Sequence, residues 1–204
     1  MAASDEHVAA GELSVEDVDW TTISLRPGTT SDEDVKAIAD LGRQVFFDTF
    51  AHTVAPESMQ QFLQDTYSEQ AIRADLTNPM RRCILAETEL KKQASQKVLL
   101  GYAFLATDST EACLEDFPKA IELLRIYCHR LAQGKGVAPR LASAAYELGK
   151  KEGYESIWLG VYPENVKAIK FYSKQGFVKV GTHDFWVGDQ RDTDDVMVRS
   201  LKEA

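Results

Sequence analysis

A short turn with two glycines, Gln133 to Ala138, carries the residues best suited to hold an anion. It lies between a strand-like run that ends at His129 and a helical pattern that follows the turn. Glycines let the backbone approach a ligand and take conformations that other residues resist. The start of a helix offers N–H groups without partners and the positive end of the helix dipole. The turn therefore predicts a binding site for a pyrophosphate.

The residues around this turn exclude two common nucleotide motifs. No Gly-Lys-Ser or Gly-Lys-Thr follows a first glycine at P-loop spacing. Pro139 stands where the third glycine of GxGxxG would be, which disfavours dinucleotide enzymes. Pro139 also lacks an N–H, so it cannot itself donate to a phosphate, although proline is tolerated in a first helical turn. An ordinary strand-to-helix turn, in which the glycines only cap and pack, is the alternative.

A second stretch with chemical potential lies at 163–177. Asn165, Ala168 and Tyr172 are spaced by three and four residues, which places them on one face of a helix. A phenol with a pKa of about 10 is protonated at neutral pH, so Tyr172 can donate a proton to a leaving group. The alternative for Tyr172 is a core aromatic residue beside Phe171.

Together, the two stretches resemble the signatures of the GNAT superfamily of N-acetyltransferases. The coenzyme A signature, Q/R-x-x-G-x-G/A, is matched by Gln133, Gly136 and Ala138. The second signature, N-x-x-A-x-x-x-Y-x-x-x-G-F, is matched by Asn165, Ala168, Tyr172, Gly176 and Phe177. The two matches lie at the separation that is typical of the family, which makes an accidental resemblance improbable.

The resemblance implies an α/β protein with the GNAT fold, a mixed and mostly antiparallel seven-stranded sheet flanked by helices. It also implies acetyl-CoA as co-substrate and direct transfer of the acetyl group to an amine through a tetrahedral intermediate. Tyr172 would protonate the leaving thiolate, and the main chain at 126–128 would pair with the pantetheine arm. The residues expected to hold the coenzyme are Ile126, Tyr127, Cys128, Gln133, Gly134, Lys135, Gly136, Val137, Ala138, Asn165, Ala168 and Tyr172.

Acetyl transfer to nitrogen needs a free amine, so an ammonium substrate must first lose a proton to a base or to water. Glu122 is the candidate base, because strand alternation from its position would place it on the face of Leu124 and Ile126. A solvated edge residue is the alternative for Glu122. A backbone N–H of Ile126 or Tyr127 would stabilise the oxyanion by about 3 kcal/mol.

The acceptor is expected to be a small primary amine. The run from Phe46 to Phe50 is similar to PaiA-like polyamine acetyltransferases, and so is the stretch at 181–189 together with the Asp192, Asp194, Asp195 and Val196-Met197 that follow it. A polyamine would suit Glu122, Asp184 and Asp189. A formal net charge of −9 disfavours nucleic acid and anionic membranes as partners. Two alternatives stay open: a protein or peptide N-acetyltransferase, and a coenzyme A-binding module without turnover.

The elements that must position these residues follow from periodicity and turn signals. Helices are expected at 31–50, 56–67 and 68–78, after the glycine turn, and at 163–173. Strands are expected at 21–26, 83–86, 98–107, 121–129, 156–162, 177–182 and 195–201, with a polar loop at 87–97.

Length and composition predict one domain. At 204 residues and 44% hydrophobic composition, we expect a single domain at 20–204 after a flexible acidic tail at 1–19. No apolar run reaches the roughly 20 residues of a membrane span, and no secretory signal is recognisable, so a cytoplasmic location is expected. The three cysteines form no CxxC pair, so thiols and no metal site are expected. The resemblance also suggests a homodimer that pairs through the C-terminal strands.

Overall fold

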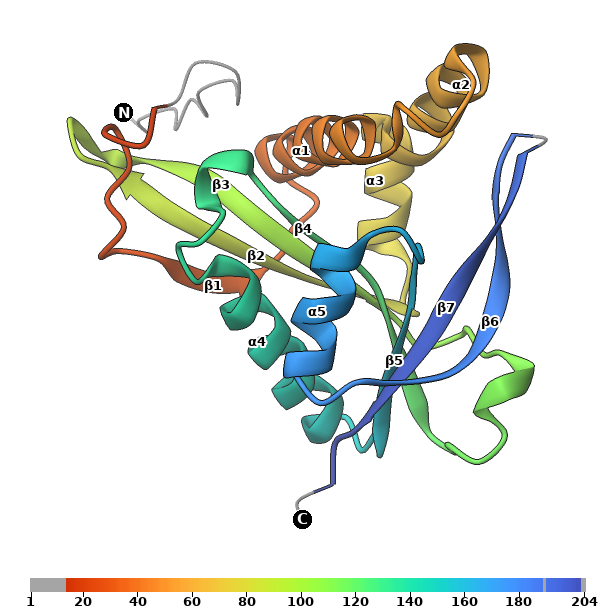
Figure 1. Cartoon of the computed structure of the whole chain (residues 1–204). Coiled ribbons are helices and arrows are strands. Elements are labelled where there is room, and N and C mark those ends of the chain that lie inside the picture. The colour runs from red at the N-terminus through yellow and green to blue at the C-terminus, as the bar shows by residue number, and fades with distance from the viewer. Residues whose placement is uncertain (1–13, 189, 203–204) are drawn as a thin grey trace.

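The computed structural model describes residues 14–188 and 190–202 of the chain. The described residues form five helices and seven strands, with two short 3-10 turns, η1 and η2 (Figure 1). The elements in chain order are β1 (Ser24–Pro27), α1 (Asp32–Phe50), α2 (Pro56–Tyr67), α3 (Glu69–Thr77), β2 (Arg81–Leu90), β3 (Gln93–Ala106), η1 (Ala112–Leu114), β4 (Ala120–Cys128), η2 (Arg130–Ala132), α4 (Val137–Lys151), β5 (Ser156–Val161), α5 (Val166–Lys174), β6 (Val178–Val187) and β7 (Gln190–Ser200).

The strands form one sheet in the order β1-β2-β3-β4-β5-β7-β6. Neighbouring strands are antiparallel except β4 and β5, which run parallel and are connected through α4. A parallel pair needs such a crossover, because a tight turn can only reverse the chain. The expected α/β fold with a mixed, mostly antiparallel seven-stranded sheet is confirmed for the described residues.

Helices cover both faces of the sheet, and each face has its own hydrophobic core (Figure 1). On one face, α1, α2 and α3 bury residues such as Ile38 and Tyr67 against β2 to β4. On the other face, α4 and α5 bury Leu141 and Tyr172. A smaller cluster around Trp158 packs beneath η1. The central strands are therefore held between two packed layers, which gives any site on them a rigid support.

Both long hairpins extend beyond the strands that the sequence predicts. β2 and β3 continue through 87–97, where a polar loop was expected. Glu87 is buried there. Its negative charge is compensated, because Arg26 Nε and Lys97 Nζ lie 2.8 and 2.5 Å from its carboxylate oxygens. β6 and β7 likewise continue to a turn at Gly188, so the acidic stretch at 183–195 is largely strand. Ladder hydrogen bonds and ion pairs outweigh the polar composition in these segments.

The packed structure begins before residue 20, which corrects the expected boundary. Val18 is fully buried and forms a β-bridge with Leu90, and the Asp19 N–H donates to the Glu89 carbonyl at 3.0 Å. The segment is acidic in composition, but it contains one apolar residue, Val18, that packs against the end of the β2–β3 hairpin. The rest of the predicted tail, 1–13, lies outside the described residues.

A buried ionic cluster fixes the start of α1. Asp34 accepts hydrogen bonds from the Arg26 guanidinium at 2.8 and 2.6 Å and from the Thr29 N–H at 2.8 Å. Burial by itself raises the pKa of the Asp34 carboxyl, but the hydrogen bonds from Arg26 and Thr29 outweigh it and lower the pKa. The ionised carboxylate therefore stabilises the fold.

We expect Asp34→Asn to lower the free energy of unfolding by about 2–3 kcal/mol near neutral pH, somewhat less than for a fully buried pair because Arg26 keeps partial contact with water. A lowered folded-state pKa gives stability that is present above the unfolded pKa of about 4 and is lost as pH falls. In urea unfolding, the difference in the free energy of unfolding between wild type and variant should therefore disappear at acidic pH. Asp40→Asn, which removes the surface pairs with Lys36 and Arg43 on the same helix, should change stability by less than about 1 kcal/mol. Equal losses in both variants would contradict the assignment.

Candidate active site

β4 and β5 separate in the middle of the sheet and leave an open strand edge (Figure 1). Their parallel pairing ends at Glu122 and Trp158. From residue 123 to 128, β4 keeps β3 as a partner on its other side, but it has no strand partner toward β5 among the described residues. Main-chain N–H and C=O groups on such an edge can pair with an extended ligand. Ile126, Tyr127 and Cys128 lie on this edge.

The glycine turn has the backbone that an anion site requires. Gly134 and Gly136 have φ of 73° and 79°, and a Cβ at either position would meet nothing within 4 Å. Gly136 caps α4, whose first-turn N–H groups have no partner within the helix. Val137 is buried, so only its main chain faces the turn, and Ala138 follows it in the same helical turn. The open space, the free donors and the helix dipole fit a pyrophosphate.

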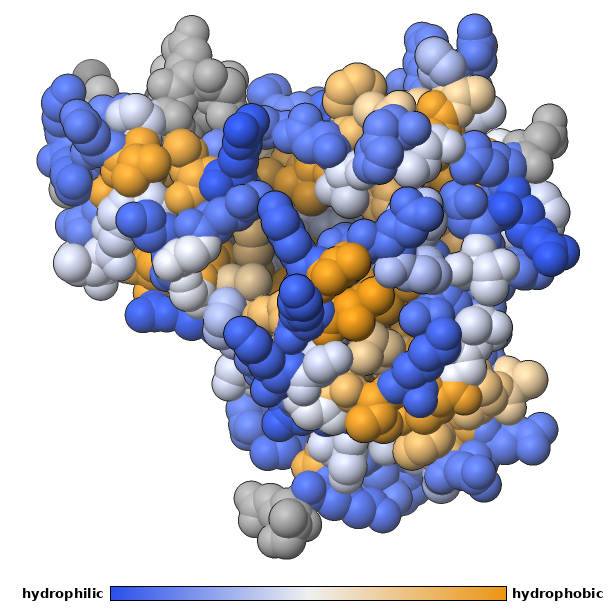
Figure 2. All heavy atoms as spheres, viewed as in Figure 1, coloured by the Kyte–Doolittle hydropathy of each residue, from blue (hydrophilic) through white to orange (hydrophobic). Residues whose placement is uncertain are grey.

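Two cavities meet between α1, β4 and α5. A polar cavity of about 600 Å³ is lined by Cys128 and Gln133, and a smaller cavity of about 220 Å³ extends from it toward the β6–β7 hairpin. Val45, Thr49 and Asn165 line both cavities, so the two cavities adjoin. In the space-filling view, hydrophobic side chains are visible in the recess between α1 and α5, and hydrophilic side chains surround it (Figure 2).

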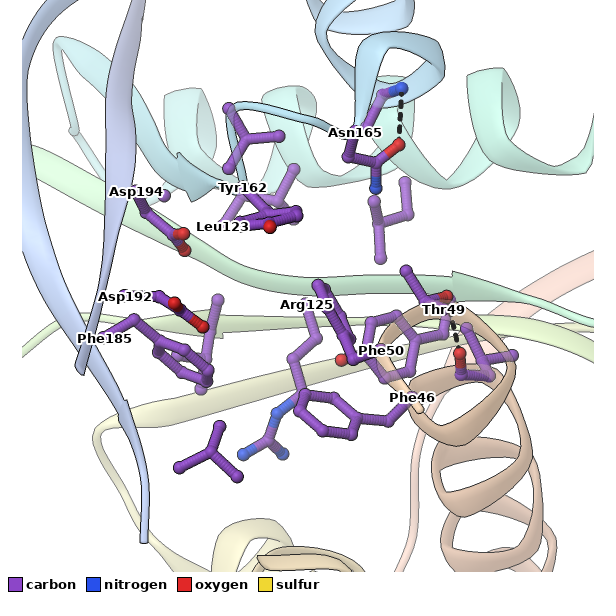
Figure 3. A pocket seen from close by; sticks show the side chains of 18 of the residues that line it. Phe46, Thr49, Phe50, Leu123, Arg125, Tyr162, Asn165, Phe185, Asp192 and Asp194 are labelled. Carbon is purple, nitrogen blue, oxygen red and sulfur yellow. Dashed lines mark hydrogen bonds between the residues drawn. The ribbon is translucent and has the colours of Figure 1, made fainter. Parts of the chain in front are cut away.

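Asn165 lies at the junction of the two cavities (Figure 3). Its Oδ1 accepts a hydrogen bond from the Ala168 N–H at 3.1 Å and caps α5. The other end of the amide, Nδ2, points into the cavity and offers donors to a ligand (Figure 3). The residue thus fixes the helix and presents a donor with the same side chain. Ala168 lines the wall of the smaller cavity beside it.

Tyr172, further along α5, lines the smaller cavity and belongs to the core at the same time. Its ring centre lies 5.2 Å from that of Phe171 and 5.5 Å from that of Phe177. Burial raises the pKa of the Tyr172 phenol, with a further contribution from Tyr146. The hydroxyl therefore stays protonated at neutral pH and is available as a proton donor. The two sequence interpretations of Tyr172 are compatible, because a residue at a cavity wall can also pack in the core.

Two carboxylates that the sequence analysis did not select, Asp192 and Asp194, line the smaller cavity from β7 (Figure 3). They are two residues apart on a strand and project from the same face. Gln190 Nε2 donates to the Asp192 carboxylate at 3.1 Å and to the Thr53 carbonyl at 3.0 Å, which ties the hairpin to the end of α1. Burial raises the pKa of Asp194 to about 6. At neutral pH this group is an ionised carboxylate that can readily accept a proton.

Aromatic rings form the remaining wall of the smaller cavity. Phe46 and Phe50 come from α1, Tyr162 follows β5, and Phe185 lies on β6 (Figure 3). The ring centres of Phe50 and Tyr162 are 5.9 Å apart, with one ring edge-on to the other. Aromatic faces attract cations through their quadrupole, so these rings and the carboxylates favour the same type of ligand, an ammonium ion.

One cation, Arg125, also lines this cavity, but its charge is already compensated. Its Nη1 lies 3.0 Å from the Asp75 carboxylate, and the guanidinium lies over the Tyr67 and Phe104 rings. Figure 3 shows that the guanidinium points away from Asp192 and Asp194. The uncompensated charge at this end of the cavity is therefore negative.

Glu122 shares the face of Leu124, as alternation predicts, but it does not share the face of Ile126. β4 carries an extra residue opposite β3 at Leu124, and this bulge reverses the alternation. Ile126 consequently packs with Leu123 in the core beneath α4, and Glu122 does not share its face. Glu122 is buried below the point where β4 and β5 separate, and it lines neither cavity; burial raises the pKa of its carboxyl. The expectation that Glu122 shares the face of Ile126 is corrected.

The two other acidic residues considered in the sequence do not line the cavities either. Asp184 is exposed and faces Arg191 at 3.4 Å across the hairpin, and Asp189 lies outside the described residues. The sequence does contain a signal for the carboxylates that were missed. Asp192 and Asp194 continue the period-two pattern of Val196 and Val198, which extends the last strand toward its acidic start.

Comparison with known proteins gives related sequences over most of the chain. Residues 46–177, more than half of the chain, match the model of the acetyltransferase (GNAT) family. An uncharacterised N-acetyltransferase from the pepI 3′ region of Lactobacillus delbrueckii subsp. lactis is 28% identical over 171 residues, which are 84% of this chain and 94% of the relative. An uncharacterised N-acetyltransferase of Mycobacterium tuberculosis is 30% identical over 148 residues, which are 72% of this chain and 85% of the relative.

Two solved structures share the fold. The PaiA N-acetyltransferase from Thermoplasma acidophilum, solved in complex with coenzyme A, superposes with a TM-score of 0.67 at 21% identity, covering 88% of this chain and 99% of that one. The spermidine/spermine N-acetyltransferase SpeG from Vibrio cholerae superposes with a TM-score of 0.57 at 18% identity, covering 89% and 94%. At these identities, the likeness shows the fold alone.

Proposed function

Because the chain belongs to the acetyltransferase (GNAT) family and is an N-acetyltransferase that uses acetyl-CoA, we propose that its acceptor is the primary amine of a small cation such as a polyamine. The observation that carries the proposal is the pair Asp192 and Asp194, which adds negative charge to an aromatic cavity. This cavity adjoins the one that Gln133 lines beside the glycine turn. A protein of similar fold, SpeG, is named as a spermidine/spermine N-acetyltransferase, which supports this acceptor class.

The residues that hold the coenzyme in this proposal are those that the sequence selected. Gly134, Gly136 and Ala138 offer main-chain donors to the pyrophosphate, with Lys135 beside them. The open β4 edge at 126–128 pairs with the extended pantetheine arm, and Asn165 offers its amide N–H groups at the junction of the cavities. The thioester then lies where Tyr172 lines the smaller cavity, next to the acceptor amine.

Asp194 acts as the base in place of Glu122. Its carboxylate binds the ammonium, accepts one proton from it and leaves a neutral amine to attack the thioester carbonyl. A main-chain N–H of Ile126 or Tyr127 stabilises the oxyanion, and the Tyr172 hydroxyl gives its proton to the departing thiolate. Direct transfer is favoured over an acylated cysteine, because burial raises the pKa of the Cys128 thiol to about 12 and so keeps it protonated.

A thiol-release assay with acetyl-CoA and a panel of amines tests this function. We expect release with small aliphatic diamines and polyamines, and we expect Tyr172→Phe to lower kcat by about 10²-fold, the lower end of the range for general acid catalysis. Tyr146→Phe is the matched control, because Tyr146 is also a buried tyrosine that contacts Phe177 but does not line the cavity. The control should keep nearly full activity.

Other outcomes of the same assay distinguish the alternatives. Thermal stabilisation by coenzyme A without thiol release for any amine or peptide, and no effect of Tyr172→Phe, would indicate a binding module. Release with peptides carrying a free N-terminus or lysine, but not with small amines, would indicate a protein N-acetyltransferase. Either result would overturn the proposed acceptor.

The cellular setting of the enzyme stays a prediction. No helix of the described residues is long and apolar enough to cross a bilayer. We retain a cytoplasmic location as a prediction, together with a homodimer that uses the C-terminal strands. β6 is an edge strand of the sheet and exposes Val178 and Trp186, which supports the second prediction.

A further inference from the structure

A group of titratable side chains lies on β4, β6 and the segment before η1, next to the base that the proposed function requires. His183 on β6 stands directly opposite Asp194 on β7. Directly opposed residues of an antiparallel pair lie on the same face, with Cβ atoms about 4.5–5.5 Å apart. Glu111 precedes η1, and Glu122 lies on β4. None of the roles proposed above uses His183 or Glu111.

The hydrogen bond of His183 determines which nitrogen is free. Its Nδ1 lies 2.8 Å from Glu111 Oε1. An ionised carboxylate only accepts, so Nδ1–H is the donor, and in the neutral ring Nε2 keeps its lone pair. Nε2 is buried and has no hydrogen-bond partner among the described residues. A buried polar atom without a partner destabilises the fold, so its presence calls for a role.

The position of the ring places this free nitrogen beside the cavity. A Cβ at Gly160 would lie 2.4 Å from His183 Nε2, so only glycine at this position lets the ring lie against β5. Gly160 itself lines the smaller cavity, as Asp194 does. On its other side, the side chain of Glu111 is 32% exposed, whereas that of His183 is 16% exposed. The three groups therefore lead from the cavity wall to solvent.

We propose that Asp194, His183 and Glu111 form a proton path that carries the acceptor's ammonium proton out of the cavity. The inference rests on the proposed function. Asp194 takes the proton from the ammonium, and His183 Nε2 takes it from the Asp194 carboxyl through one bridging water. The imidazolium then releases its Nδ1 proton to Glu111, which gives it to water. These steps leave two carboxylates and a neutral His183 ring with its hydrogen on Nε2. A ring flip, or exchange through water, then returns this hydrogen to Nδ1 before the next turnover.

The charges around His183 are compatible with this path. Glu111, Glu122 and Asp194 surround the ring from three elements, and their negative charges stabilise a transient imidazolium. Arg81 is the opposing charge, because it acts on Glu122 from β2. Burial, together with the charges of Asp192 and Asp195, raises the pKa of Asp194 to about 6. The first proton acceptor of the path therefore has a pKa close to neutral pH.

Steady-state kinetics of His183→Gln test the path in the full-length enzyme. We expect kcat to fall by about 10²-fold at neutral pH with little change in the KM of the amine, and the deficit to shrink at alkaline pH where hydroxide can remove the proton. Added imidazole should restore activity to His183→Ala, and Glu111→Gln should show a smaller deficit of the same pH dependence. His52→Gln, which changes an exposed histidine, is the control.

A second measurement does not depend on turnover. Nitrogen-15 NMR of wild-type His183 should show the neutral ring with hydrogen on Nδ1, whereas hydrogen on Nε2 would overturn the path. Wild-type kcat in His183→Gln, or a loss that imidazole and alkaline pH leave unchanged, would also overturn it while leaving the proposed function intact. Absence of thiol release by the wild type would refute the proposed function itself, and the path with it.

Discussion

Asp194→Asn should lower kcat/KM for the amine by about 10³-fold, within the range for loss of a general base, while coenzyme A binding stays unchanged. The variant keeps the shape of the side chain but can neither pair with an ammonium nor accept its proton. Its fold should persist, because burial already disfavours the charged form of Asp194 and the amide removes that charge. Thiol release and calorimetric titration with coenzyme A measure the two effects separately.

The pH dependence of the wild type provides a second readout of the same residue. The pKa of Asp194 is raised to about 6, so the carboxylate is protonated below this value. We therefore expect kcat/KM to fall as pH decreases through about 6, by about tenfold per unit. This acid limb should be absent from the residual activity of Asp194→Asn.

Asp195→Asn is the matched control for the loss of activity. Asp195 is the next residue on β7, and its carboxylate lies 2.5 Å from Lys179 Nζ. Because side chains alternate along a strand, it projects from the face opposite to Asp194. An equal loss of activity in the two variants would show that strand disruption, and not the base, causes the effect.

Gly136→Val should weaken coenzyme A binding by about 10³-fold, because losing two charge-assisted hydrogen bonds costs about 1.5–3 kcal/mol each. Gly136 has φ of 79°, where a β-branched residue is strongly disfavoured, so the substitution moves the N–H groups at the start of α4. It also fills the open space beside the turn. Isothermal titration with coenzyme A measures the change.

Gly153→Val separates backbone strain from ligand binding. Gly153 follows the other end of α4 and has φ of 84°, and a Cβ added there would meet nothing within 4 Å, as at Gly136. The two variants should lose similar stability, but Gly153→Val should keep the wild-type affinity for coenzyme A. Weakened binding in both would mean that the glycine turn does not hold the phosphates.

The features that the sequence determined are local ones. The conformations of Gly134 and Gly136, the start of α4 and the Asn165 cap of α5 depend on residues within a few positions of one another. Residues close together in the sequence determine such geometry, so the glycine turn and the face of α5 could be predicted from spacing and turn chemistry. The same holds for α1, whose Ser31 cap and apolar period give both its start and its buried face.

The tertiary structure decided which carboxylate serves the cavity. A single extra residue at Leu124 reverses the side-chain alternation of β4 and places Ile126 on the face opposite to Glu122. Pairing of β7 with β5 and β6 brings Asp192 and Asp194 beside residues far away in the chain, including Phe50 and Tyr162. Register between distant strands depends on burial and ladder pairing across the whole sheet, so no short stretch of sequence contains it. Local chemistry therefore determined the candidate coenzyme site, and long-range register determined the candidate base.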